Sequence, residues 1–251
     1  MRSVTRSRLL ANDRKGAQFF VNDGTFYIEF LSQVRRTFGV QSYFEVGSHT
    51  GASLAPVTCD TVAVDPGFKL NQDVVGSKRA CMLFQMTSDA FFSKYDLSAL
   101  LGGPVQMAFL DGLHIYEYLL RDFMNTERHM ARNSVVFMHD CMPPTFEVSR
   151  RTHPGPGKGW AGDVWKTVPI LQRYRPDLQI TAFDCRPTGL VMITNLDPTS
   201  TVLEENYFEA VKDMAEGADD EKRLAEYRES VEPVSTAPIK KLPDLARHIW
   251  L

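Results

Sequence analysis

The sequence predicts an α/β protein with a mostly parallel sheet, because strand-like and helix-like segments alternate along it. Seven strand-like runs recur at intervals that leave room for helices, and most are continuously apolar, as in strands buried on both faces. They are the runs 43–46, 61–64, 81–85, 105–110, 134–138, 179–183 and 190–194. Such alternation favours parallel strands joined by right-handed crossovers.

Two segments outside these runs have apolar residues at helical spacing. Residues 26–38 carry Phe26, Phe30, Leu31 and Val34. Residues 116–130 carry Leu119, Leu120, Phe123 and Met130. We therefore expect one helix before the first strand and another after the fourth.

The last two runs are separated only by residues 184–189, which is too short for a helical crossover. These runs should form an antiparallel hairpin at the edge of the sheet. The expected architecture is thus a doubly wound, mostly parallel sheet of seven strands that ends in a C-terminal antiparallel hairpin.

The 251 residues are enough for one large domain. We assign residues 1–198 to a single α/β domain that begins with an N-terminal helical segment over 1–40. Residues 141–162 are rich in Pro and Gly, and a loop of that length in a compact domain is usually functional or disordered. Because it follows a group of ionisable residues, we expect it to act as a substrate-facing lid.

Residues 199–251 are expected to form a C-terminal helical extension and a tail. Thr201 and Glu204 have the spacing of a capping box. The residues expected to dock this helix are Val202, Leu203, Phe208 and Val211. The tail from Glu232 onward contains three prolines and is expected to be extended or mobile.

Composition excludes several classes of function. The net charge of −3 gives no basis for nucleic-acid binding, and no apolar run approaches the roughly 18 residues of a membrane span. Residues 1–15 are basic but lack the apolar core of a secretory signal, which favours a solvated arm over a transit peptide. The four cysteines form no C-x-x-C pair, so we expect reduced core cysteines and a cytoplasmic protein.

A glycine-containing loop follows the first predicted strand. Gly47 and Gly51 allow the backbone to pass close to a ligand, and a helix starting after them would offer free N–H groups. Their spacing is not that of the dinucleotide fingerprint. Glu45 could receive a cationic amine, and Asp65, after the second strand, could accept hydrogen bonds from a ribose. The alternative is a plain turn followed by a solvated acid.

Ionisable residues also end the fourth and fifth predicted strands. Asp111 with His114 follows the fourth, and His139 with Asp140 ends the fifth. Ligands of open α/β sheets bind outside the carboxyl ends of the strands, so this rim suits a metal site, a general base or both. Alternatively, Asp111 caps the next helix, His114 is a hydrogen-bonded surface histidine and His139 is a hydrogen-bonded core histidine.

Aromatic and charged residues near this rim have simpler interpretations. Asp163 is expected in the first turn of a helix that follows the long loop. Trp165 is expected to pack that helix onto the sheet, and Trp160 is the better candidate for ligand contact. Glu117 and Asp122 are expected to be helix-surface charges, with Asp122 alternatively supporting a ligand.

Taken together, these motifs resemble those of class I S-adenosylmethionine-dependent methyltransferases. The motifs are Glu45-x-Gly47-x-x-x-Gly51, Asp65-Pro66, Asp111-Gly-Leu-His-Ile-Tyr-Glu117 and His139-Asp140. The nearest likeness is to the small-molecule and sugar O-methyltransferase branch with a D-G-x-H-x-Y motif. The resemblance spans about residues 40–195 and implies a Rossmann-like sheet with a reversed seventh strand.

The resemblance also implies a cofactor site. The cofactor-binding residues would be Glu45, Gly47, Ser48, Gly51, Asp65, Ser88, Asp89 and Asp111. Glu45 and the two glycines would surround the methionine part of S-adenosylmethionine. Asp65 would hold the ribose hydroxyls, and the segment 87–89 would lie near the adenine.

In the metal-dependent members of this branch, acids at the ends of strands four and five bind a divalent cation, and the following histidine acts as base. By position these are Asp111, Asp140 and His114. His139 stands where several relatives carry another acid. A metal set of Asp111, His139 and Asp140 makes manganese, iron or zinc more competitive with magnesium. Alternatively, His139 points inward.

The resemblance therefore implies a methyltransferase that performs metal-assisted O-methylation of a hydroxylated small molecule or sugar, with no nucleic-acid or membrane partner. His114 and Asp111 would be the catalytic residues. A homo-oligomer and N-methylation remain open. Two alternatives are a metal-dependent hydroxylase on the same fold and a non-catalytic binding protein with a methyltransferase fold.

Overall fold

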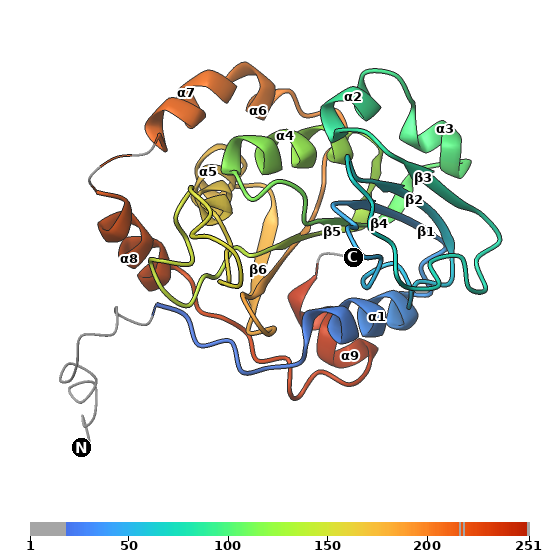
Figure 1. Ribbon diagram of the computed structural model, residues 1–251, viewed down its shortest axis with the longest axis horizontal. Coiled ribbons are helices and arrows are strands. Elements are labelled where there is room, and N and C mark those ends of the chain that lie inside the picture. The colour runs from blue at the N-terminus through green and yellow to red at the C-terminus, as the bar shows by residue number, and fades with distance from the viewer. Residues whose placement is uncertain (1–18, 216, 218, 250–251) are drawn as a thin grey trace.

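A seven-stranded sheet forms the middle layer of the protein, seen in a computed structural model that describes residues 19–215, 217 and 219–249 (Figure 1). The expected basic arm over 1–15 lies outside the described residues. The strands are β1 (Ser42–Val46), β2 (Asp60–Val64), β3 (Cys81–Phe84), β4 (Val105–Leu110), β5 (Met130–His139), β6 (Gln179–Phe183) and β7 (Leu190–Thr194). Their order is β3-β2-β1-β4-β5-β7-β6. Only β7 runs antiparallel to its neighbours β5 and β6, which confirms the predicted Rossmann-like sheet and its terminal hairpin.

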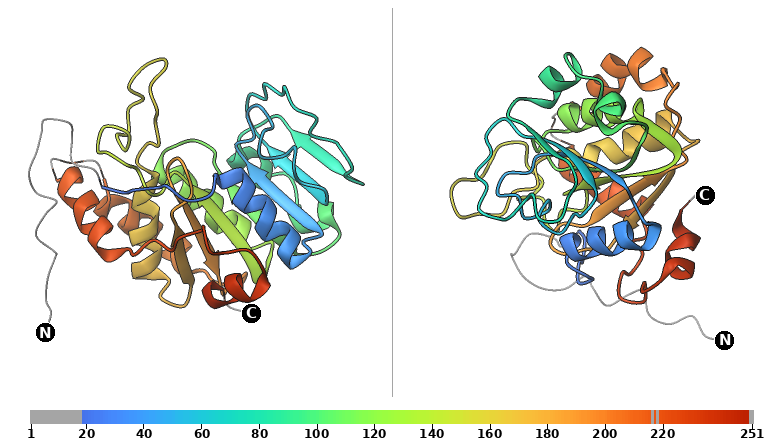
Figure 2. Two further views of the ribbon diagram at one scale, coloured as in Figure 1. Left: turned by 90° about the horizontal axis from the view of Figure 1, so that it is seen from below. Right: turned by 90° about the vertical axis from the view of Figure 1, so that its right-hand side faces the viewer.

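Helices cover both faces of this sheet (Figures 1 and 2). They are α1 (Tyr27–Phe38), α2 (Ser88–Phe92), α3 (Leu97–Leu101), α4 (Tyr116–Glu127), α5 (Thr167–Tyr174), α6 (Val202–Glu205), α7 (Tyr207–Asp213), α8 (Asp220–Ser230) and α9 (Leu242–Leu245). Two short 3-10 helices, η1 (Val164–Lys166) and η2 (Ala246–His248), complete the described elements. In Figure 1, α2 to α5 lie on one face, and α1 and α9 lie on the other.

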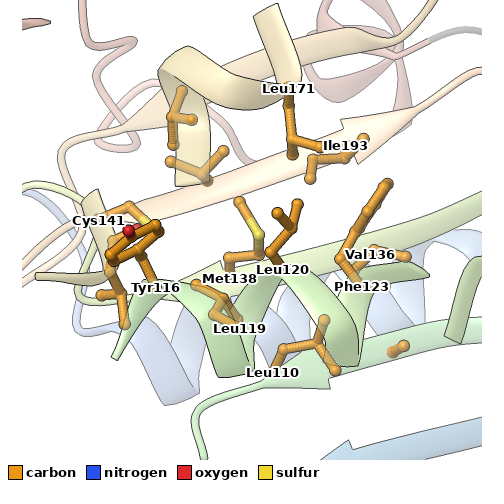
Figure 3. Close-up of a cluster of buried hydrophobic side chains, with 14 of the residues drawn as sticks. Leu110, Tyr116, Leu119, Leu120, Phe123, Val136, Met138, Cys141, Leu171 and Ile193 are labelled. Atoms are coloured by element: carbon orange, nitrogen blue, oxygen red, sulfur yellow. The ribbon is translucent and has the colours of Figure 1, made fainter. Parts of the chain in front are cut away.

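Side chains alternate along each strand and so build two cores. In β4, Ala108 and Leu110 belong to the core that includes α4, whereas Met107 and Phe109 belong to the core that includes α1. Figure 3 shows the first core, where side chains of α4 meet those of β4, β5 and β7. Because both faces of the central strands are buried, these strands read as continuous apolar runs.

Two predicted boundaries were wrong. Helix α4 ends at Glu127, not at residue 130, and β5 extends over Met130–His139 rather than 134–138. Met130 is buried and pairs with Val105 of β4. Its apolar side chain fits the helical spacing, but strand pairing with a distant segment decides its conformation.

The helix expected after Gly51 is also absent. Residues 49–56 form consecutive turns and a bend, and all residues between β1 and β2 are described. The Gly51 amide donates to the Ser48 carbonyl, and the Ala55 amide donates to the Gly51 carbonyl. The backbone N–H groups of this loop therefore come from turns rather than from a helix N-terminus.

The C-terminal extension differs from its prediction in three ways. The capping box does not form, because the Thr201 hydroxyl donates to Glu205. Leu203 is buried as expected, but Phe208 is 85% exposed and Val202 is also exposed. The tail is extended only in part and is docked: Val234 forms a β-bridge with β6, and the later residues form α9 and η2, of which α9 packs against α1. No helix in the described ranges is long and apolar enough to cross a membrane.

Candidate active site

A cavity of about 940 Å³ lies at the carboxyl ends of β1, β2 and β4, where open α/β sheets bind ligands. Its volume is within the range of roughly 300–1,000 Å³ found for small-molecule sites. Seven predicted site residues border it: Gly47, Ser48, Asp65, Ser88, Asp89, Asp111 and His114. The other four predicted site residues are not part of its lining: Glu45, Gly51, His139 and Asp140.

The glycine loop brings the end of β1 close to the end of β4. Gly47 has a φ of +86°, and a Cβ at this position would overlap the backbone carbonyl of Asp111. Gly51 has a φ of +82°, and a Cβ there would press on the Val74 side chain. Both glycines are therefore explained by the close approach of the chain to itself, and their contact with a cofactor stays a prediction.

Glu45 is fully buried below the loop. The hydroxyls of Tyr43 and Ser53 each donate to its carboxylate at 2.7 Å. Burial raises the pKa of Glu45 to about 7 even though these hydrogen bonds oppose the shift. Ser53 borders the cavity, whereas Glu45 does not, so contact between Glu45 and a cationic amine stays a prediction.

Asp65 is held at the cavity wall by backbone donors. The amides of His49 and Gly67 each donate to one of its carboxylate oxygens at 2.7 Å. Each oxygen keeps a further lone pair, so the carboxylate can still accept hydrogen bonds from a diol. The predicted ribose contact is compatible with this geometry.

Acids and imidazoles converge at the ends of β4 and β5. Ligand atoms of Asp111, His139 and Asp140 all lie within 4.8 Å of one another. Nδ1 of His139 is 3.2 Å from Oδ1 of Asp111 and 3.4 Å from Oδ1 of Asp140. The sequence predicted this cluster because the carboxyl ends of neighbouring parallel strands share one rim.

A strained backbone and a hydroxyl orient Asp140. Its φ of +61° is left-handed, a conformation uncommon outside glycine that Asp tolerates better than most residues. The Thr188 hydroxyl, from the turn between β6 and β7, donates to its Oδ1. The antiparallel hairpin thus supports the site as well as closing the sheet.

His114 contacts both carboxylates. Its Nε2 is 3.5 Å from Oδ1 of Asp111, and its Nδ1 is 3.2 Å from Oδ2 of Asp140. Nδ1 also lies 3.0 Å from the Trp160 carbonyl. His114 is partly exposed and hydrogen-bonded, as in the alternative interpretation, but its ring also joins the two carboxylates of the rim.

The charges in this cluster shift its pKa values in opposite directions. Burial disfavours a charged His114, but the Asp111 hydrogen bond and the charges of Asp140 and Asp111 outweigh it and raise the pKa to about 9. The pKa of His139 is also raised, because the same two carboxylates outweigh burial. The pKa of Asp111 falls to about 2, since the two imidazoles overcome its desolvation. The carboxylates therefore create a site that favours positive charge.

The donor set fits a divalent transition metal. Two carboxylates and one imidazole converge, and Nδ1 of His139 faces an oxygen of each acid at 3.2 and 3.4 Å. Magnesium prefers an all-oxygen shell, whereas an imidazole suits iron, manganese or zinc better. Asp111 and Asp140 with His139 could hold such an ion.

Asp111 does not cap helix α4. The first amide of α4, from Tyr116, instead donates a hydrogen bond to Oδ1 of Asp163 at 3.1 Å. Asp163 precedes η1 rather than lying in a first helical turn, so it caps a neighbouring helix. Asp111 is left free to serve the rim.

Aromatic rings flank the cluster on two sides. The Tyr27 ring lies 4.1 Å from the His139 ring, and the Trp160 ring lies 5.0 Å from the His114 ring. Tyr27 and Trp160 both border the cavity, together with His153. Trp165 is buried in the core, as expected. Nothing in the sequence singled out Tyr27 or His153.

The loop over 141–162 is docked onto this rim. Arg151 contacts Glu117 at 2.8 Å and Asp163 at 3.1 Å, and the Ala161 amide donates to the Val148 carbonyl. Figure 2 shows the loop rising on the same side of the sheet as the segment between β2 and β3. Glu117, expected as a surface charge, thus anchors the loop.

Asp122 was also expected on the helix surface, and this prediction was wrong. It lies in α4, is only 3% exposed and borders the cavity. The neighbouring Arg121 turns away and pairs with Asp89 at 2.8 Å. Its apolar helix neighbours gave no sign of this burial, which depends on how α4 packs against α2.

Comparison with known proteins finds one family model and several solved structures of similar fold. Residues 44–141 match the family model described as a methyltransferase domain, and no curated protein matches the chain.

Cofactor-bound Rv0187 from MTB has a TM-score of 0.51 at 13% identity, over 67% of this chain and 78% of that chain. A candidate O-methyltransferase from Klebsiella pneumoniae has a TM-score of 0.50 at 12% identity, over 67% and 79%. The O-methyltransferase TomG from Streptomyces achromogenes, solved with S-adenosylmethionine, has a TM-score of 0.49 at 12% identity, over 67% and 77%. The family model therefore identifies a methyltransferase domain over residues 44–141, and the solved structures of Rv0187 and the Klebsiella pneumoniae protein share the fold of this chain.

Proposed function

We propose that this protein transfers a methyl group from S-adenosylmethionine to a hydroxyl of a small molecule or sugar, assisted by a divalent cation. The observation that carries the proposal is one cavity shared by two sets of residues. The glycine loop and Asp65 form one set, and Asp111 with His114 forms the other. The sheet order places Asp65 and Asp111 on opposite sides of β1.

The cofactor supplies an electrophilic methyl group on sulfur, which a nucleophilic oxygen displaces in line. The task of the protein is then mainly positioning, which can supply roughly 7–11 kcal/mol of the barrier. Asp65 would fix the ribose, and the turn at Gly47 and Ser48 would fix the methionine part. This arrangement directs the methyl group toward the acid–imidazole cluster.

The acceptor hydroxyl must also lose its proton. His114 is the imidazole of the acid–imidazole cluster that borders the cavity, and two carboxylates and the Trp160 carbonyl hold its ring. A cation held by Asp111, His139 and Asp140 would lower the pKa of the acceptor hydroxyl and offset the negative field that raises the pKa of His114. His114 would then be free to accept the proton.

The acceptor would lie between the aromatic residues of the rim. Tyr27 and Trp160 flank the cluster, and their faces suit planar rings and the apolar faces of sugars. Because the loop over 141–162 carries Trp160 and touches His114, we propose that this loop shapes the acceptor site.

Calorimetry with S-adenosylmethionine and S-adenosylhomocysteine tests the proposal. Both should bind the full chain, and manganese should bind with reduced affinity to Asp140→Asn. Asp96→Asn is the matched control, because Asp96 caps α3 outside the cavity and Asn is an equally good cap. Absence of binding by both sulfur nucleosides would overturn the proposal. Release of S-adenosylhomocysteine with a panel of phenols and sugars would then identify the acceptor.

The imidazole of His139 in the metal set supports one competing function, hydroxylation at an iron site. Metal analysis and activity assays separate the two. Tightly bound iron, with no methyl transfer in the presence of either magnesium or manganese, would favour the hydroxylase. Methyl transfer supported by manganese would exclude it as the main activity.

A further inference from the structure

One acid of the cavity has no role in the chemistry described so far. Asp122 is 3% exposed, and its Oδ1 is buried without a hydrogen-bond partner in the described part of the chain. The Asp122 carboxyl has one hydrogen-bond partner among the described side chains, which is the Ser88 hydroxyl. Both residues border the cavity.

No cation of the described residues forms an ion pair with this buried carboxyl, although the charge of Arg121 acts on it from a distance. The guanidinium of Arg121 is directed to Asp89 at 3.0 and 2.8 Å and to the Tyr207 hydroxyl at 2.8 Å. Burial, followed by the charge of Asp89, raises the pKa of Asp122 to about 7. A buried acceptor without a partner is costly, so a ligand that donates a hydrogen bond to it would recover that cost.

The position of Asp122 indicates which part of a nucleoside would meet it. Oδ2 of Asp122 lies 3.4 Å from the place that a Cβ on Gly112 would take, and Ser88 follows β3. Asp122 thus lies between the segments after β3 and β4. Asp65 follows β2, which is the neighbour of β3 in the sheet. A ribose held by Asp65 would direct its base toward Ser88 and Asp122, away from the pair of His139 and Asp140.

We propose that the Asp122 carboxylate accepts a hydrogen bond from the exocyclic amino group of the adenine and so selects a 6-amino purine. This inference rests on the proposed function, because it assumes that S-adenosylmethionine occupies the cavity. A 6-oxo purine presents an oxygen instead of an amino group at the same place. Two acceptors would then face each other in a buried site, and sites built around a hydrogen bond reject such analogues strongly.

The test compares S-adenosylhomocysteine with S-inosylhomocysteine, its deaminated analogue, by calorimetry at pH 8.5. The wild type should bind the adenosine form at least about 30-fold more tightly. Asp122→Asn should reduce this ratio to about 3-fold or less, because its amide can donate to the 6-oxo group or accept from the amino group. The control Asp96→Asn should keep the wild-type ratio.

The ratio of two affinities is insensitive to partial unfolding, because both ligands bind the same folded fraction. Equal binding of the two ligands by the wild type would overturn the inference without any variant. A ratio that is unchanged in Asp122→Asn would also overturn it, although the proposed function would stand. Failure of the wild type to bind either ligand would overturn both.

Discussion

The carbonyl oxygen of Trp160 lies 3.0 Å from Nδ1 of His114, and this contact joins the loop over 141–162 to the proposed base. The Trp160 ring packs on the same imidazole, and the indole nitrogen donates to the Arg150 carbonyl. The loop therefore does more than cover the cavity, because it fixes the orientation of His114.

Gly162→Ala should separate this loop from the rim. Gly162 has a φ of +65°, and a Cβ there would overlap the His114 carbonyl. We expect kcat to fall by about 10-fold or more, since small misplacements of catalytic groups are costly, while the affinity for S-adenosylhomocysteine changes little. Gly159→Ala is the control, because its Cβ would meet nothing within 4 Å. Equal kcat values for the two variants would contradict the coupling.

Thr188→Val should weaken metal binding without removing a ligand. The Thr188 hydroxyl donates to Asp140, and loss of a residue that supports a metal ligand typically reduces affinity about 10- to 100-fold. Manganese titration of the full chain measures this effect. Thr181→Val is the matched control, because the Thr181 hydroxyl donates to the His248 carbonyl away from the site. Unchanged manganese affinity in Thr188→Val would show that Asp140 needs no such support.

Asp122→Asn should alter how stability depends on pH. Burial raises the pKa of Asp122 to about 7 in the folded protein, whereas an aspartate in the unfolded chain has a pKa of about 4. The folded state therefore favours the neutral form of Asp122. The stability that this preference contributes is fully present below about pH 4 and is lost as the pH rises through 7. The wild type loses about 4 kcal/mol of stability in this way. Asp122→Asn has no titrating group at this position and does not show this loss.

Urea unfolding at pH 5 and pH 8.5 measures this difference. Relative to the wild type, Asp122→Asn should gain stability at the higher pH. Glu45, whose pKa burial also raises to about 7, contributes equally to both proteins and cancels. Asp122→Ala should show the same pH dependence at lower overall stability. A difference that does not vary with pH would contradict the assignment to Asp122.

Arg175→Met should destabilise the fold at a place remote from the cavity. Arg175 is 2% exposed and contacts Glu127 at 2.7 and 3.0 Å. Its removal leaves a buried carboxylate without its partner, which typically costs about 3–5 kcal/mol. Arg173→Met, which breaks an exposed pair with Asp213, should change the free energy of unfolding far less, because exposed ion pairs contribute little. Similar urea midpoints for the two variants would be the contrary result.

Local sequence patterns were sufficient to predict the seven strands and the group of ionisable residues at the carboxyl ends of two of them. Seven apolar runs of strand length predicted seven strands, because strands that are buried on both faces consist almost entirely of apolar residues. The short link over 184–189 predicted the reversed β7. Asp111 and His139 could be placed together because parallel strands end at one edge, a consequence of topology rather than of side-chain packing.

The tertiary structure alone decided features that depend on contacts between distant segments. Met130 entered β5 because Val105 pairs with it, and Asp163 became the cap of α4 because the long loop returns to that helix. Asp122 was mistaken for a surface charge, since helical periodicity shows which residues share a face but not what covers that face.

The acid–imidazole cluster was thus determined by the sequence, because each of its members ends a strand or closely follows one. Packing of distant segments decided three other features. The contact of α4 with α2 buries Asp122, and the contact of α1 with the sheet places the Tyr27 ring over His139. The contact of the loop with the rim places the Trp160 carbonyl against His114. The physical reason is range. Strand ends follow from local patterns, whereas these contacts join segments between about 34 and 112 residues apart.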